Sequence, residues 1–261
     1  MTIVAAYKYA SDISDVDVRR DASLDWTHAR PRVSEYERTA IQTAHNLAAQ
    51  CGVQAVGVSV GAQLAASSKA KQAALSAGLD RLILAVDDAT LGWSATRQAA
   101  ALASVVRMVD DAALVICGEA SSDESRSIVP ALLASALGWP VFENVTAIDV
   151  AAPASASPAT ASFRLTQQTS SGHRVIDLSG PAVISVVAHS VAIHVASASE
   201  IREAASRPVT VIPAASVDTM SVQNAVVSSR LPEPKERKGK IFAGPDAVDD
   251  LMHALDQDGV L

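Results

Sequence analysis

The segment from Leu114 to Pro140 holds the residues of this chain whose types and spacing are best suited to binding a small ligand. A short apolar run, Leu114–Cys117, is followed by Gly118 and by a loop rich in Ser, Asp and Glu. A helical pattern then begins, with its apolar residues at Ile128, Val129, Leu132, Leu133, Ala136 and Leu137. A strand, a polar loop and a helix N-terminus in succession form the corner at which open α/β sheets bind ligands, especially those that carry phosphate.

The chain lacks the residue patterns that are typical of an enzyme active site. Its histidines are scattered, with neither the spacing of metal ligands nor an HExxH pattern. P-loop and GxGxxG motifs are also absent from the sequence. Asp123 and Glu124 are adjacent on a loop, where their carboxylates diverge, so we interpret Asp123 as a loop-shaping or ribose-contacting group. We therefore expect neither catalytic residues nor a metal site.

The composition is that of a globular protein with a sizeable apolar core. Of its 261 residues, 49% are hydrophobic and 19% are charged, and the formal net charge is −7. This charge argues against a nucleic acid partner, whose binding needs clustered Lys and Arg. It does not argue against nucleotides, because helix N-termini can hold a phosphate without basic side chains. Cys51 and Cys117 each lie in or beside an apolar element, and we expect both to be buried free thiols.

The sequence predicts a cytoplasmic protein with no direct insertion into a membrane. The N-terminal apolar run is too short for a signal peptide, and no basic region precedes it. The most hydrophobic stretch, Pro181 to Ala196, is interrupted by His189 and His194. It also falls short of the ~20 residues that a membrane-spanning helix needs.

Strand-like and helix-like runs alternate through the first half of the chain. The expected strands are short, apolar and bounded by Gly or polar residues: Ile3–Tyr7, Gln54–Ser59, Arg81–Val86 and Leu114–Cys117. The expected helices lie between them: one from Ser34, with Glu37 completing a capping box, then Leu64–Ser76 and Ala95–Val109. This alternation predicts an α/β fold of the Rossmann-like, adenine-nucleotide-binding type, with a mainly parallel sheet and helices on both faces.

The second half changes in character after Pro140. Four more strands are expected, and we interpret them as antiparallel additions to the same sheet: Phe142–Val150, Ser162–Gln168, His173–Leu178 and Pro181–Val187. The low-complexity loop AAPASASPATA separates the first two. We therefore expect an α/β domain over residues 1–212. Residues 213–261 are expected to form an extended arm, ending in a helix at Asp246–Leu255, that serves as a linker or a partner-binding tail.

The order and spacing of several segments resemble the beta subunit of electron transfer flavoproteins over almost the whole chain. The resemblance rests on Lys8 with Asp12, on Val58–Gly61, on Ala77–Arg81, on Ile116–Pro140, on Pro181–Val183, and on Arg237 with Gly239. SLDW at 23–26, SEY at 34–36 and CGEASSD at 117–123 look most like the Fix-type branch of that family. That branch is linked to anaerobic acyl-CoA reduction.

The resemblance implies an electron-carrier subunit in a heterodimer. An alpha subunit would hold most of an FAD, and this chain would provide a wall for the flavin and a buried AMP site. The loop Ser34–Glu37 and the run Glu119–Pro130 match the positions that line AMP in the family. The implied cofactor-binding residues are Ala6, Ser34, Tyr36, Val60, Glu119, Ser122, Asp123, Ser125, Arg126 and Ser127. Tyr36 would lie beside the methylated ring of the flavin; its alternative role is an exposed aromatic in the first turn of a helix.

Two departures from the family pattern leave alternatives open. Ile128-Val129-Pro130 stands where family members that hold a phosphate have Gln-Thr-Gly or Gln-Val-Gly, so a side-chain donor and one backbone N–H are lost. Ser125, Arg126 and Ser127 could compensate, or they could form a polar helix cap without a ligand. Ala198 stands where other members have a leucine that docks on acyl-CoA dehydrogenases, which favours a different redox partner, such as a reductase.

A second hypothesis is a stand-alone adenine-nucleotide-binding domain of a sensor type. It would use the same loops, bind no flavin and need no partner. The extended C-terminal arm favours the heterodimer, since a self-contained sensor has no use for it.

Overall fold

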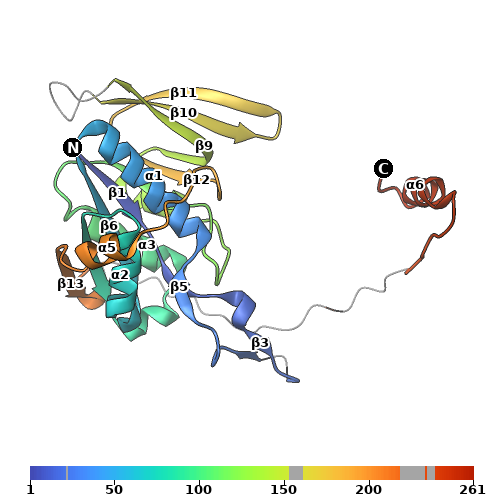
Figure 1. The fold of residues 1–261 in the computed structure, drawn as a ribbon, viewed down its shortest axis with the longest axis horizontal. Helices are drawn as coiled ribbons and strands as arrows, with labels where there is room; N and C mark the ends of the chain where they lie inside the picture. Colours follow the sequence, from blue (N-terminus) through green and yellow to red (C-terminus); the bar gives the residue numbers. More distant parts are fainter. Residues whose placement is uncertain (22, 153–160, 218–232, 234–238) are drawn as a thin grey trace. The chain divides into compact units, whose positions relative to one another are not determined.

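A mostly parallel sheet forms the centre of the computed structural model, which describes residues 1–21, 23–152, 161–217, 233 and 239–261 (Figure 1). Within these residues nine strands pair in the order β11-β10-β9-β12-β8-β1-β6-β7-β13. The strands from the first half of the chain are β1 (Thr2–Ala6), β6 (Gln54–Gly61), β7 (Arg81–Val86) and β8 (Ala112–Gly118). Those from the second half are β9 (Val141–Ala152), β10 (Ser162–Thr169), β11 (Gly172–Ser179), β12 (Ala182–Val186) and β13 (Val209–Pro213).

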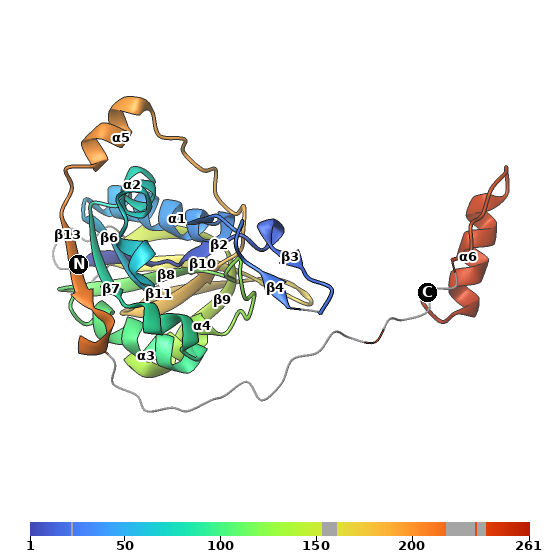
Figure 2. The same cartoon turned by 90° about the horizontal axis from the view of Figure 1, so that it is seen from below.

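Helices cover both faces of this sheet, as the alternation of strands and helices predicts (Figure 2). One face carries α1 (Glu35–Cys51), α2 (Ser68–Ser76) and α5 (Ala198–Ala204). The other carries α3 (Ala95–Val106) and α4 (Val129–Leu137). Successive side chains of β1 point to opposite faces of the sheet. Ile3 packs in the core on the side of α1, and Val4 packs in the core on the side of α3 and α4. The α/β fold class is therefore confirmed.

Two expected antiparallel strands are instead parallel. β12 pairs in parallel with β8 on one side and with β9 on the other, so β9 is parallel to the main sheet as well. Of these four expected strands, β10 and β11 are the two that pair in antiparallel fashion. The physical reason is burial: all five residues of β12 are buried, and a continuous apolar run is the pattern of a strand covered on both faces.

Short elements near the carboxyl end of β1 do not follow from the hydrophobic pattern. Two small antiparallel ribbons form there, one from β2 (Tyr9–Ser11) with β5 (Pro31–Val33), the other from β3 (Asp17–Val18) with β4 (Leu24–Asp25). Single turns of 3-10 helix occur after β2 at Ile13–Asp15, and after β6, β7 and β13 at Gln63–Ala66, Asp88–Gly92 and Ala214–Ser216. Segments this short have too few residues to show a period.

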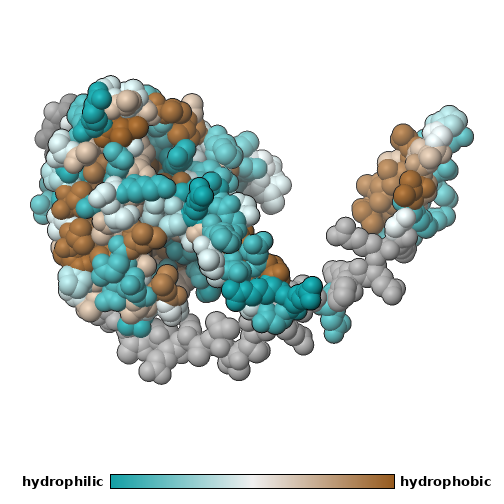
Figure 3. All heavy atoms as spheres, turned by 60° about the horizontal axis from the view of Figure 1, so that its bottom comes forward, coloured by the Kyte–Doolittle hydropathy of each residue, from teal (hydrophilic) through white to brown (hydrophobic). Residues whose placement is uncertain are grey.

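The chain divides into two units, Met1–Ala225 and Val226–Leu261. The second unit contains α6 (Ala247–Gln257), in which no residue is buried and whose apolar side chains Val248, Leu251 and Met252 are exposed (Figure 3). Residues 218–232 and 234–238 of the predicted arm, which include Arg237, and residues 153–160 of the low-complexity loop lie outside the described residues. The boundary expected after residue 212 stays a prediction. Across the described residues, none of the helices combines the length and apolar character that a membrane crossing requires.

Phe163 of β10 should anchor the antiparallel ribbon to the core. Its side chain is 1% exposed and is among the largest that are fully buried. Phe163→Ala is expected to lower the free energy of unfolding by about 3–5 kcal/mol, because it removes apolar contacts and leaves a cavity. Val175→Ala, on the exposed side of β11, should change it by less than about 0.5 kcal/mol. Urea denaturation measures both; equal effects would contradict this role of Phe163.

Candidate functional site

A cavity lies at the carboxyl ends of the strands, where the strand order reverses. From β1 the chain proceeds to β6 and β7 on one side, and β8, β12 and β9 lie on the other. The connections that leave β1 and β8 therefore run in opposite directions, which opens a crevice between them. Residues just beyond these two strands line this crevice, together with the start of α4. This is the corner that the segment Leu114–Pro140 predicts.

The cavity combines an apolar wall with polar groups. The wall is formed by Ala6, Tyr7, Val60, Leu102, Cys117 and Val129. The polar groups include Lys8, Glu37, Gln98, Glu119, Arg126 and Ser127. An apolar cleft with a few convergent polar groups is typical of sites for small molecules and cofactors. Tyr7, Lys8, Gln98 and Leu102 were not among the expected site residues, because their side chains converge only through the packing of β1 and α3.

Five of the ten expected site residues line the cavity: Ala6, Val60, Glu119, Arg126 and Ser127. The other five lie next to it and serve the loop or the start of α1: Ser34, Tyr36, Ser122, Asp123 and Ser125. The hydroxyl of Ser122 donates to the carbonyl oxygen of Ser11 at 3.4 Å, and that of Ser125 donates to the carbonyl oxygen of Ser121 at 3.2 Å. These bonds hold the loop after β8 in place.

An ion-pair cluster ties this loop to the end of β1. The ammonium of Lys8 lies 2.7 Å from a carboxylate oxygen of Asp123 and 3.5 Å from one of Glu124. Arg126 pairs with Glu124 at 3.2 Å. Burial alone would raise the pKa of the Asp123 carboxyl, but the hydrogen bond and charge of Lys8, helped by Ser121, lower it overall. Asp123 is thus engaged in shaping the loop, one of the two roles that the sequence left open.

The start of α4 offers a reduced set of donors to a ligand. Pro130 lies in the first turn and has no N–H, while Ile128 precedes the helix without a side-chain cap and is 45% exposed. Before the helix, Ser125 and Ser127 have φ angles of 47° and 52°, a left-handed conformation that costs energy for residues other than Gly. A non-Gly backbone held in this region is typical of ligand-binding loops.

The start of α1 packs directly against the end of β8. A Cβ at Gly118 would lie 2.9 Å from the carbonyl carbon and oxygen of Tyr36, so only Gly fits here. Ser34 precedes α1 as predicted, but the expected capping box is wrong, because its side chain makes no cap hydrogen bond. Among the described residues the Ser34 hydroxyl is buried without a partner. Glu37 points to the cavity instead.

Glu37 is a buried acid in the wall of the cavity. Its side chain is 6% exposed, and burial raises its pKa to about 8. A hydrogen bond with the backbone of Lys8 and the charge of Lys8 oppose this shift, and the charge of Asp123 adds to it. Burial, and then the charge of Glu37, also raise the pKa of the Tyr7 hydroxyl and of the Cys117 thiol. Both cysteines are free, as predicted, although Cys51 is only partly buried.

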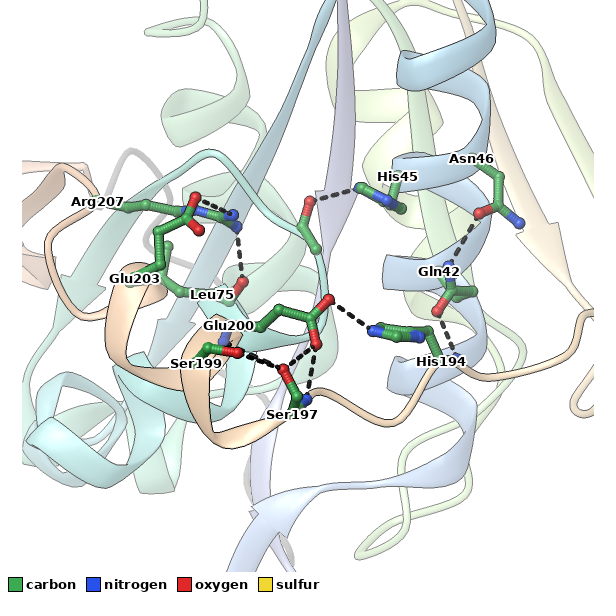
Figure 4. Close-up of polar contacts among 11 residues, drawn as sticks. Gln42, His45, Asn46, Leu75, His194, Ser197, Ser199, Glu200, Glu203 and Arg207 are labelled. Atoms are coloured by element: carbon green, nitrogen blue, oxygen red, sulfur yellow. Dashed lines mark hydrogen bonds and ion pairs between the residues drawn. The ribbon is translucent and has the colours of Figure 1, made fainter.

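A segment that crosses α1, residues 188–197, is fastened by its backbone (Figure 4). The N–H of Ala188 donates to Glu119 Oε1 at 3.0 Å, and the N–H of His194 donates to Gln42 Oε1 at 2.9 Å. α5 then begins with a capping box of Ser197 and Glu200. Hydrogen bonds from Ser197 and an interaction with His194 lower the pKa of Glu200 to about 2. Ala198, where other members of the family have a leucine, is the first residue of this helix.

Glu37→Gln should remove a pH dependence of stability. Between pH 4.5, the ordinary pKa of glutamate, and about 8, the folded protein keeps a proton on Glu37 that the unfolded chain releases. The free energy of unfolding of the wild type therefore falls as pH rises through this range. The variant should gain stability relative to wild type by up to about 1.4 kcal/mol per pH unit. Urea denaturation across the range, with exposed Glu35→Gln as control, measures this; parallel curves would contradict it.

Gly118→Ala should disturb the junction of β8 and α1. The added methyl would push against the backbone of Tyr36, which cannot move as a flexible side chain could. We expect a loss of about 1–3 kcal/mol in the free energy of unfolding. Gly92→Ala is the matched control, because its Cβ would meet no atom within 4 Å. Thermal melts of the two variants should differ clearly; similar melts would argue against the close approach.

A family model described as "Electron transfer flavoprotein domain" matches residues 25–217 of this chain. The matched region covers well over half of the chain and includes α1, the loop after β8, α4 and α5.

Proposed function

This chain belongs to the electron transfer flavoprotein domain family, and on that premise we propose that it is the beta-type subunit of a heterodimeric electron transfer flavoprotein. It would shuttle electrons through an FAD held mainly by an alpha subunit, and would need no catalytic residues of its own. The observation that carries this proposal is the cavity at the reversal of the strand order, in a chain of this family.

An adenine nucleotide such as AMP suits the residues of the cavity. Its planar base matches the apolar wall around Ala6, Val60 and Cys117. Its phosphate matches the α4 end, where Arg126, Ser127 and the remaining backbone N–H groups of the first turn could hold it. The proline at 130 weakens this cradle by one donor, and the charge of Arg126 offsets that loss in part.

The flavin would lie against the other side of the α1 start. Tyr36 is half-buried there, next to Gly118, and could place its ring beside the isoalloxazine. The buried hydroxyl of Ser34, without a partner among the described residues, is available as a donor on the same turn. FAD supplies the redox chemistry; the chain's residues would orient it and exclude water.

The second unit supports a protein partner. An apolar surface on α6 that no described residue covers is costly in water, so we propose that this helix and the arm before it contact the alpha subunit. Ala198, at the start of the capped helix α5, removes the apolar group of a leucine. A reductase or another redox partner in anaerobic acyl-CoA or related reductive metabolism is therefore proposed in place of the usual dehydrogenases.

A stand-alone nucleotide-binding role has one observation in its favour. All residues that line the cavity belong to the first unit, so a nucleotide could bind without a partner.

Purification of the full chain from its host under conditions that preserve complexes separates the two functions. A companion flavoprotein subunit, an FAD absorption spectrum and release of AMP on denaturation are the results expected for the electron carrier. A colourless chain that is isolated alone with a bound adenine nucleotide would overturn the heterodimer and support the sensor.

Lys8→Met is expected to weaken nucleotide retention. It removes the cation that holds Asp123 and Glu124, so the loop after β8 should lose its anchor on β1. Loss of a partly buried pair typically costs about 1–3 kcal/mol, which corresponds to a rise of roughly 5- to 150-fold in the Kd for AMP. Lys69→Met, an exposed lysine on α2, is the control and should bind as wild type. Calorimetric titration measures both; unchanged affinity of Lys8→Met would argue against the anchor.

A further inference from the structure

Glu37 is a buried acid in the wall of the cavity. Among the described side chains, none forms a close ion pair with its carboxyl group. The proposed electron-carrier role does not use it. Glu119, also in the wall, accepts a hydrogen bond from the N–H of Ala188. Lys8 is near Glu37, but its ammonium is engaged 2.7 Å from Asp123 and 3.5 Å from Glu124. Glu37 therefore receives from Lys8 mainly a backbone hydrogen bond.

The groups that face Glu37 favour its neutral form. Tyr7 and Lys8 face it from the end of β1, Cys117 from β8, and Asp123 from the loop after β8. Tyr7 and Cys117 are buried and uncharged at neutral pH, and Asp123 is an anion. A carboxylate placed among them would be desolvated and repelled, with only the shared charge of Lys8 to offset this cost.

A neutral carboxylic acid offers a ligand something that a carboxylate cannot. It has a hydroxyl donor next to a carbonyl acceptor, whereas a carboxylate has acceptors only. The edge of adenine has the matching pair, an amino donor beside a ring-nitrogen acceptor. The backbone N–H of Lys8 can occupy a lone pair of the carbonyl oxygen and leave the hydroxyl free to donate.

We propose that Glu37 is a specificity-determining residue of the cavity, which binds the amino edge of adenine as a neutral acid and so couples nucleotide binding to a proton. This inference rests on the proposed function, because it assigns a role within the proposed adenine-nucleotide site. Gln98 and the first turn of α4 are then left to contact the ribose and the phosphate. Raising the pH until Glu37 ionises removes the donor and places an anion against the ring nitrogen.

Calorimetric titration of AMP into the full chain at about pH 7 and pH 9.5 tests the proposal. If only the neutral acid binds, the apparent Kd of the wild type should rise about 30-fold between these values, in proportion to the fraction that keeps its proton. Glu37→Gln, whose amide also pairs a donor with an acceptor, should bind AMP with nearly the same Kd at the two pH values. Glu37→Leu should bind weakly at both, because it offers neither group.

The control variant is Glu35→Gln, which lies on the same helix and is exposed; it should reproduce the pH dependence of the wild type. Thermal melts of Glu37→Gln verify that this variant is folded. Equal affinity of the wild type at the two pH values would overturn the role of Glu37 but not the proposed nucleotide site. A wild-type pH dependence in Glu37→Gln would do the same. A wild type that binds no AMP at either pH, also in complex with its flavoprotein partner, would overturn this inference together with the proposed nucleotide site.

Discussion

The reversal of strand order beside β1 is the constraint on which the rest of the structure depends. β1 is buried along its whole length and pairs in parallel with β6 on one side and β8 on the other. Helices cover both faces of these strands, but no helix can follow both strands at their carboxyl ends, because their connections diverge. The crevice that results is a property of the topology. The residues that follow β1 and β8 decide what the crevice can hold.

α1 connects the parts of this site. Its first turn approaches Gly118 so closely that a side chain would not fit, and the same turn places Glu37 in the cavity wall. One turn later, Gln42 accepts a hydrogen bond from the backbone of His194 in the segment that leads to α5. Glu119 reaches that segment from the cavity through the N–H of Ala188. The cavity and the surface around α5 are therefore joined by short polar contacts from α1 and from the loop after β8.

The charges of the cavity follow a consistent pattern in a chain with a net charge of −7. Lys8 and Arg126 are the basic residues among those that line it, and both are shared with acidic residues of the loop after β8. Such a site holds a phosphate less by free positive charge than by backbone donors and shape. The same shortage of free cations explains why Glu37, the buried acid of the wall, is most stable when it carries a proton. An electron carrier needs no more from the protein than this kind of cofactor environment.

The sequence alone determined the parallel core, because four buried strands and the helices between them carry clear periods, and Gly118 with the polar loop marked the binding corner. Its order of motifs also indicated the family to which the chain belongs. Only the tertiary structure decided that β12 lies between β8 and β9, since strand direction depends on pairing partners far along the chain. Likewise, Ser34 and Glu37 have the spacing of a capping box, but the approach of α1 to β8 turned Glu37 into a buried wall of the cavity. Local pattern predicts an element, whereas burial and the nearest charges assign the role of each side chain on it.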